Sequence, residues 1–179
     1  MTLPEATSDP KDADITKQVE TLAETLFSGA LGPNGVVLGI TNNDVVADNL
    51  RSLVTDPGNT VATYTVGDKL VGFSVAVPID KMDSTRSSES QETAYIYFTG
   101  VQPELQGQGH VGPLMDDMYR KLRTRGYQFV ERDSMIENGY ADNVEKANEG
   151  AIDEGSMYDY DPWGLGMERH FRIDLSKAP

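Results

Sequence analysis

The 179-residue sequence contains no cysteine, which excludes disulfide bonds, thiolate metal sites and a cysteine nucleophile. Its apolar runs are far shorter than the roughly 20 residues that a membrane-spanning helix needs. The N-terminus also lacks the basic-then-apolar pattern of a secretory signal. We therefore expect a cytoplasmic protein with no membrane segment, and the length is typical of a single domain.

Basic residues are scarce as well. The 15 Lys and Arg face 29 Asp and Glu, so the formal net charge is −14 and the pI is about 4.4. DNA or RNA binding needs clustered Lys and Arg, so we expect no nucleic-acid partner, whereas a cationic amine substrate would be favoured. Acidic excess of this kind also resembles proteins of a high-salt cytoplasm, where salt screens the repulsion; an ordinary acidic protein is the alternative.

The most informative stretch of the chain runs from 101 to 115, with the sequence VQPELQGQGHVGPLM. A strand-like run, AYIYFTGV, leads into a loop with three glycines, and an amphipathic helix follows at once. A strand, a glycine loop and a helix start together aim several backbone N–H groups at an anion. This pattern predicts a site for a phosphorylated cofactor.

Other phosphate-binding motifs fit this stretch less well. The sequence has no GxxxxGK[ST], so a P-loop nucleotide hydrolase is not supported. GQGHVG matches GxGxxG at Gly107, Gly109 and Gly112, but no clear ribose-binding acid and no further βαβ units follow it. A lone GxGxxG is a weak signal for a dinucleotide site.

The stretch more closely resembles motif A of the GNAT (Gcn5-related) N-acetyltransferases. That pattern is V-x-P at the end of a strand, two residues, then Q/R-x-x-G-x-G/A opening a helix; Val101, Pro103, Gln106 and Gly109 are in register with it. Val111 occupies the final small position, with a glycine one residue later. The resemblance implies an acetyl-CoA-dependent N-acetyltransferase that acts on a primary amine of a small molecule or a protein, and a homodimer is plausible by family analogy.

The same resemblance implies an α/β fold, with a mixed, largely antiparallel twisted sheet and helices on both faces. Strands are predicted at 61–66, 70–77, 94–101, 127–134 and 170–175, with a turn at Gly67-Asp68. Residues 1–11 are expected to be a flexible tail before a single domain at 12–179. Helical spacing of apolar residues predicts helices over about 15–27 and 46–54, with a short strand at 36–40 between them. The polar segment 81–91 is interpreted as a solvated loop that could also border the acceptor.

The family resemblance also implies the cofactor-binding residues. The main chain of Thr99, Gly100 and Val101 would pair with the pantetheine amides where the central strand leaves its neighbour, and Gly100 fits a local kink or bulge there. Asn138 would touch the pantetheine arm, although Glu145 replaces the tyrosine common seven residues later. The residues expected to wrap the diphosphate are Gln106, Gly107, Gln108, Gly109, His110, Val111 and Gly112.

Three residues are candidates for proton transfer. Tyr97 would donate a proton beside the thioester, unless its ring, like that of Tyr95 on the same predicted face, only packs on the sheet. Glu131 is a candidate base acting through water or else a solvent-facing strand acid, and Tyr158 could replace the missing tyrosine. His170 is expected to pair with a nearby acid. No His, Asp and Glu set has metal spacing, so we expect no catalytic metal.

Two alternatives remain. Val111 and Glu145 at motif positions also suit a GNAT-fold protein that binds acyl-CoA without turnover, as a sensor or interaction module. A different fold with an accidental motif would show no affinity for CoA.

Overall fold

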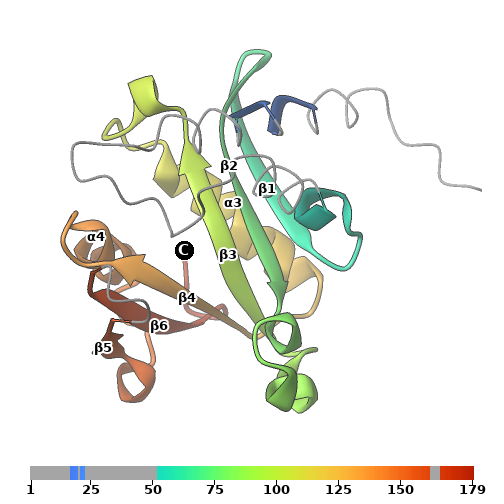
Figure 1. Cartoon of the computed structure of the whole chain (residues 1–179), viewed down its shortest axis with the longest axis vertical. Coiled ribbons are helices and arrows are strands. Elements are labelled where there is room, and N and C mark those ends of the chain that lie inside the picture. Colours follow the sequence, from blue (N-terminus) through green and yellow to red (C-terminus); the bar gives the residue numbers. More distant parts are fainter. Residues whose placement is uncertain (1–16, 20, 23–51, 162–165) are drawn as a thin grey trace, which may run out of the picture.

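The computed structural model describes residues 17–19, 21–22, 52–161 and 166–179 (Figure 1). The predicted tail at 1–11, the predicted strand at 36–40 and most of the two predicted N-terminal helices lie outside the described residues. Of those helices, residues 17–19, 21–22 and 52–55 are helical, as expected.

The described residues form one six-stranded mixed sheet with the order β1-β2-β3-β4-β6-β5. All neighbouring strands pair antiparallel except β3 and β4, which pair parallel. The strands are β1 (Thr60–Val66), β2 (Lys69–Pro78), β3 (Thr93–Val101), β4 (Phe129–Met135), β5 (Tyr158–Tyr160) and β6 (Glu168–Asp174). The five predicted strands are confirmed, whereas β5 was not predicted, because three residues are too few to show an alternating pattern.

Two helices, α3 (Val111–Thr124) and α4 (Tyr140–Ala147), cover one face of the sheet. α3 forms where the sequence predicts it, and Gly126, whose φ of 90° favours glycine, follows its C-cap Arg125. Its apolar positions are buried against the strands, which makes this face the larger core. The buried residues of α3 are Leu114, Met115, Met118, Tyr119 and Leu122.

The opposite face of the sheet carries a second, smaller core. Val19 and Leu22 of the N-terminal helical segment pack there with Phe73 of β2, and the partly buried Leu53 packs against the same cluster. β2 is therefore buried on both faces, which explains its nearly continuous apolar sequence LVGFSVAV. Helices on both faces of a mixed, largely antiparallel sheet confirm the predicted architecture.

β3 and β4 diverge soon after they meet. Thr93 to Tyr95 pair with Phe129 to Glu131, and both strands then continue without pairing to each other. Figure 1 shows the resulting V-shaped separation between the two strands. This is the splay that the family resemblance implied.

The irregularity in β3 lies at Tyr97 rather than at Gly100. Ala76 pairs with Ile96 and Val75 with Phe98, so Tyr97 is an extra residue on β3. Gly100 pairs with Phe73 in regular register, so the expectation of a bulge at Gly100 is wrong. A bulge adds local twist, and this one begins just after β3 leaves β4, so it suits the divergence of the two strands.

The connections within the described residues contain four short 3-10 helices: η1 (Ile79–Lys81), η2 (Ser84–Glu89), η3 (Pro103–Leu105) and η4 (Glu154–Ser156). The segment 81–91 is largely exposed, as expected, but it is more ordered than a plain loop. The Asp83 carboxylate accepts a hydrogen bond from Thr85 N at 2.9 Å and caps η2. η2 in turn directs Arg86 toward the sheet, where it contacts Glu131.

Candidate cofactor and acceptor site

The glycine loop lies between the end of β3 and the start of α3, as the sequence predicts. Gly107 and Gly109 have φ values of 74° and 85°, a region that side chains with a Cβ rarely adopt. A Cβ on either glycine, or on Gly112, would meet no protein atom within 4 Å, so open space adjoins all three. Gly112 has neither a positive φ nor a close neighbour, so the fold alone does not require glycine there.

The main chain of this loop offers hydrogen-bond donors. In the part of the chain that the structure describes, the N–H groups of Gly107, Gly109 and His110 donate to no protein acceptor. His110 stands at the N-cap of α3 without a side-chain cap, so the helix dipole adds positive potential at this point. Free N–H groups at a helix start suit a phosphate or diphosphate.

The polar side chains of the loop hold its shape. Gln106 Nε2 donates to Val101 O at 3.1 Å, and Gln108 Nε2 donates to Glu104 O at 2.9 Å. The His110 ring packs against Tyr64 with 5.7 Å between ring centroids. Anion contacts in this arrangement therefore come from the main chain more than from these side chains.

The end of β3 presents an open edge to the splay. Thr99, Gly100 and Val101 pair with β2 on one side, while no described strand pairs with their other side. An extended chain with amide groups, such as a pantetheine arm, could pair with this edge. The loop and the edge together fit a cofactor that has a diphosphate followed by an extended arm.

Asn138 lies in the turn before α4. Its Oδ1 accepts a hydrogen bond from Tyr140 N at 2.9 Å, which fixes the side chain at the start of the helix. Asn138 is exposed, and its amide nitrogen donates to no acceptor among the described residues.

Glu131 is buried in an ion-pair network on the face of the sheet opposite α3. Its side chain is 3% exposed, and Arg86 binds both carboxylate oxygens, at 2.7 and 2.8 Å. Arg172 Nη1 lies 2.6 Å from Oε1. Burial raises the pKa of Glu131, but the hydrogen bonds from Arg86 and Arg172 outweigh burial, so the pKa is lowered overall. Two guanidinium partners and a depressed pKa argue against the predicted base role.

Asp133 and His170 form a second polar pair on the same face of β4 and β6. His170 Nδ1 lies 2.8 Å from Asp133 Oδ1, which places His170 beside an acid as expected. The Tyr95 hydroxyl donates to Asp133 Oδ2 from across the splay. Burial raises the pKa of Asp133, yet the hydrogen bonds from His170 and Tyr95 lower it overall. Tyr95 is therefore a structural bridge between β3 and β4, and not a free hydroxyl.

The two other predicted catalytic tyrosines are exposed. Tyr97 is 48% exposed at the bulge of β3, and Tyr158 is 54% exposed on β5. The Tyr158 ring stacks on His170 with 4.9 Å between ring centroids, and burial and the charge of Asp133 raise the pKa of its hydroxyl. Tyr158 therefore stays protonated near neutral pH and suits a proton donor, not a base.

Sequence reasoning missed Arg86, Asp133 and Tyr95 as parts of this site. The sequence did contain a signal for Asp133: it is two residues after Glu131, and side chains two positions apart on a strand share one face. Arg86 carried no such signal, because 45 residues separate it from Glu131.

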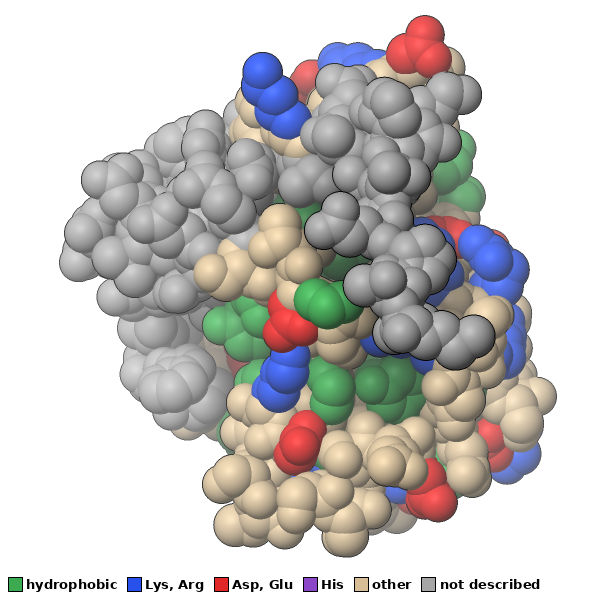
Figure 2. Space-filling model, turned by 90° about the vertical axis from the view of Figure 1, so that its right-hand side faces the viewer, with side chains coloured by type: hydrophobic (Ala, Val, Ile, Leu, Met, Phe, Trp, Pro, Cys, Tyr) green, Lys and Arg blue, Asp and Glu red, His purple; other side chains and the backbone are tan. Residues whose placement is uncertain are grey.

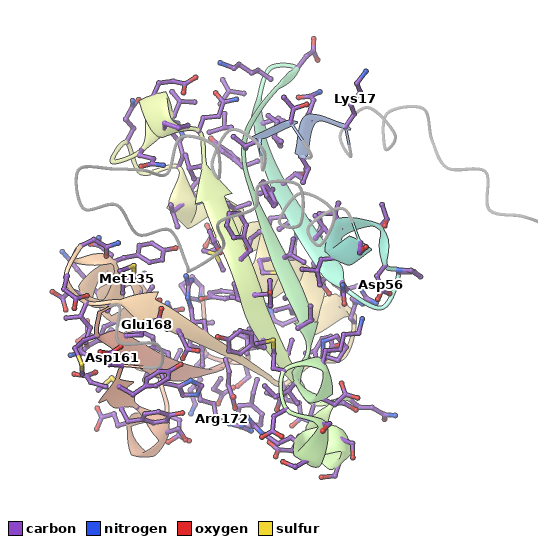
Figure 3. All side chains as sticks on the ribbon, in the orientation of Figure 1. Lys17, Asp56, Met135, Asp161, Glu168 and Arg172 are labelled. Carbon is purple, nitrogen blue, oxygen red and sulfur yellow. The ribbon has the colours of Figure 1, made fainter. Side chains whose placement is uncertain are left out.

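A set of acidic residues lies next to this network, where β4 ends at Met135 and β6 begins at Glu168. Figure 3 shows Met135, Asp161 and Glu168 in this region, and Met135 pairs with Glu168 in the sheet. Burial, and then the negative charges of Asp133 and Asp161, raise the pKa of Glu168. This part of the face would attract a cationic group.

The described surface otherwise shows mixed charge. Figure 2 shows acidic and basic side chains interspersed on one face of the molecule, with hydrophobic side chains between them. Among the described residues, no group of three His, Asp or Glu side chains could hold a metal ion. No helix in the described ranges is long and apolar enough to cross a membrane.

Comparisons with known proteins agree with this geometry. A sequence profile of the Acetyltransferase (GNAT) family matches residues 34–144. A search of curated proteins found no match.

Solved structures share the fold at low sequence identity. YncA from Salmonella typhimurium, solved with its cofactor acetyl-CoA, has a TM-score of 0.61 and 14% identity over 94% of this chain and 91% of that chain. Aminoglycoside 6'-acetyltransferase type Ii has a TM-score of 0.62 and 10% identity, with 97% and 98% coverage. GCN5 from Tetrahymena has a TM-score of 0.55 and 13% identity, with 97% and 94% coverage. At such identities the likeness shows the shared fold alone.

Proposed function

Because the chain belongs to the GNAT acetyltransferase family, whose cofactor is acetyl-CoA, we propose that it transfers an acetyl group to a primary amine. The acceptor is a small molecule or a protein amine. The observation that supports this best is the combination of two features on one strand. β3 leaves β4 after Tyr95, and the glycine loop with free N–H groups follows the end of the same strand.

The cofactor lies along β3 in this proposal. The N–H groups of the loop from Gln106 to Gly112, aided by the dipole of α3, bind the diphosphate. The open main-chain edge at Thr99, Gly100 and Val101 pairs with the pantetheine amides, and Asn138 reaches the arm from the turn before α4. This arrangement places the thioester beside the bulge at Tyr97.

Bound acetyl-CoA supplies an activated carbonyl and a thiolate leaving group. The amine nitrogen forms a bond to the carbonyl carbon, and the carbon–sulfur bond breaks. A main-chain N–H of β3 near the bulge polarises the carbonyl oxygen, which stabilises the charge that develops there. The exposed Tyr97 hydroxyl donates the proton that the thiolate takes up, and Tyr158 is the second candidate for that role.

The amine must be neutral when it attacks. Glu131 is not suited to remove its proton, because both carboxylate oxygens accept hydrogen bonds from arginine. We assign Glu131 to positioning: it holds η2 and β6 against β4. His170, which Asp133 orients through Nδ1, is the better candidate to receive the proton, through water, because neither side chain has an arginine partner among the described residues.

The acidic residues at the ends of β4 and β6 support a cationic acceptor. Glu168, Asp161 and Asp133 would raise the local concentration of an ammonium group before it loses its proton. The chain as a whole carries a net charge of −14, which adds to this attraction.

Binding of acyl-CoA without turnover is the second candidate function. Glu145 favours it, because this residue occupies the position of the family tyrosine and its carboxylate forms an ion pair with Arg169 at 2.8 Å. Detection of free CoA thiol with any amine would exclude it.

The test is a thermal-shift titration with acetyl-CoA, CoA, NAD and ATP, followed by an amine screen that measures release of free thiol. Stabilisation by the two CoA species alone is the expected result. If no CoA species shifts the melting temperature of folded protein, the cofactor assignment for this chain fails.

We also propose that the acidic composition is an adaptation to a high-salt cytoplasm. The excess of 29 acidic over 15 basic residues supports this, because dense negative charge destabilises a fold unless salt screens it.

A further inference from the structure

Arg132 is a buried cation at the point where the splay opens. It is the first residue of β4 beyond the segment that pairs with β3. Its side chain is turned to the α3 face of the sheet, and the residue is 3% exposed. An arginine in this setting has almost no contact with water, so its charge depends on protein or ligand partners.

The partners of Arg132 among the described residues are neutral side chains: Tyr140, Tyr119 and Met115. Nη2 donates to the Tyr140 hydroxyl at 3.0 Å, Nη1 lies 3.8 Å from Met115 Sδ, and the guanidinium sits 5.1 Å from the Tyr140 ring centroid. Nε is buried and has no hydrogen-bond partner. Throughout the described residues, no carboxylate lies within ion-pair distance of Arg132. A buried charge without a counter-ion is costly, which points to an anion that the described residues do not supply.

Met115 of α3 links the Arg132 guanidinium to Thr99 of β3. Thr99 Oγ1 lies 4.0 Å from Met115 Sδ, the same sulfur that Arg132 Nη1 contacts. Arg132 on β4 and Thr99 on β3 therefore each contact the Met115 sulfur, from opposite sides of the splay, on the α3 face. Thr99 belongs to the edge that we assign to the pantetheine arm, and Arg132 begins where β3 and β4 separate. An acyl group that extends from the thioester toward the α3 face would approach this point.

The acidic residues of β4 do not cancel this charge. Glu131 and Asp133 alternate with Arg132 along the strand, so they point to the opposite face. There Arg86 and Arg172 bind Glu131, and His170 binds Asp133. The α3 side of the splay keeps an unmatched positive charge.

We propose that Arg132 binds a carboxylate at the end of the acyl group, so that the enzyme uses short dicarboxylic acyl-CoA donors, such as succinyl-CoA, in addition to acetyl-CoA. This inference rests on the proposed acyl transfer. The chemistry is unchanged: the amine forms a bond to the thioester carbonyl and loses its proton to the base, the carbon–sulfur bond breaks, CoA leaves as thiol with the proton from the general acid, and the terminal carboxylate takes no part. A guanidinium is well suited to a carboxylate because it offers several donors in a plane.

The test compares dissociation constants of acetyl-CoA, butyryl-CoA and succinyl-CoA, measured by calorimetry on the wild-type protein. Butyryl-CoA is the matched control, because its chain carries a methyl group where succinyl-CoA carries the carboxylate. We expect succinyl-CoA to bind about tenfold more tightly than butyryl-CoA, the scale of one charge-assisted hydrogen bond. Equal or weaker binding of succinyl-CoA would overturn the proposal, while binding of acetyl-CoA would leave the acetyl-transfer function intact. Absence of binding by all three would instead refute the proposed function.

Two variants separate recognition from a structural role. Arg132→Met should bind acetyl-CoA as the wild type does and lose the preference for succinyl-CoA over butyryl-CoA. Tyr140→Phe, which keeps the charge but removes the hydroxyl that holds Nη2, should reduce the preference partially. If folded Arg132→Met still binds succinyl-CoA more tightly than butyryl-CoA, another group binds the carboxylate and the proposal is wrong. The wild-type comparison decides the question if that variant does not fold.

Discussion

The cofactor loop requires two properties of residue 109: a positive φ, and no side chain beside the free N–H groups. Gly109 has a φ of 85°, which excludes most side chains, and its Cβ position opens onto space beside the free N–H groups. We expect Gly109→Asp to abolish CoA binding with the fold retained, because the new carboxylate would stand where the diphosphate binds. Calorimetry with CoA measures the loss, and circular dichroism checks the fold.

Gly126→Asp is the matched control for this substitution. Gly126 has a φ of 90°, and a Cβ there also meets no atom within 4 Å, but it lies at the other end of α3. The control carries the same backbone strain and charge, so it should lower stability and leave CoA affinity unchanged. Unchanged CoA affinity in Gly109→Asp would remove the assignment of the loop.

Tyr97 is the exposed hydroxyl that we place beside the thioester. Tyr97→Phe should lower kcat by about 100-fold, the usual contribution of a general acid, and leave the KM for acetyl-CoA nearly unchanged. Steady-state kinetics with an amine identified by the screen gives both values. Tyr158→Phe is the comparison, and a large loss there with none at Tyr97 would transfer the role to Tyr158.

At the scale of elements, β4 separates two kinds of charge onto its two faces. Glu131 and its arginine partners join η2, β4 and β6 on one face, whereas Arg132 occupies the other. η2 therefore depends on a carboxylate distant in sequence for its attachment to the sheet. The decrease in the free energy of unfolding when the Glu131 carboxylate is removed measures the strength of that attachment.

Glu131→Gln should lower the free energy of unfolding by about 2 kcal/mol, below the full value of a buried pair because the Arg86 side chain is 27% exposed. Urea unfolding at neutral pH measures the change. Glu89→Gln is the control, because Glu89 also pairs with Arg86 at 2.7 Å but is 39% exposed, and it should lower the free energy of unfolding much less than Glu131→Gln does. Equal costs for the two variants would contradict the anchoring role of Glu131.

The same network predicts how stability depends on pH. Folding lowers the pKa of Glu131 from 4.5, so the unfolded chain takes up a proton at a higher pH than the folded chain does. The stabilising contribution is therefore complete above about pH 4.5 and is lost as the pH falls toward the lowered pKa. Melting temperatures between pH 7 and 3 should fall more steeply for the wild type than for Glu131→Gln. Parallel curves would contradict the linkage.

At the scale of the whole molecule, the net charge of −14 opposes the compact state. The Debye length shrinks to about 3 Å in 1 M salt, so repulsion between surface acids is then largely screened. We expect the melting temperature to rise from low salt to molar KCl, as measured by differential scanning calorimetry. A parallel series in sucrose controls for general exclusion effects, and no rise in KCl would contradict the high-salt proposal.

The sequence by itself determined the elements whose signals are local. The spacing of Leu114, Met118 and Leu122 specifies α3, and glycines at 107, 109 and 112 mark the loop before it, because these patterns lie within one or two turns of chain. The resemblance of Val101 to Gly109 to GNAT motif A then predicted the sheet, the splay and the cofactor.

Only the tertiary structure decided which polar groups meet. Glu131 reads as a free strand acid until Arg86, 45 residues earlier, and Arg172, 41 residues later, bind it. Nothing near Arg132 in sequence shows that it is buried without a carboxylate. The position of the bulge at Tyr97 also depends on the register with β2. Burial, ion pairing and register are relations between distant segments, so no local pattern encodes them.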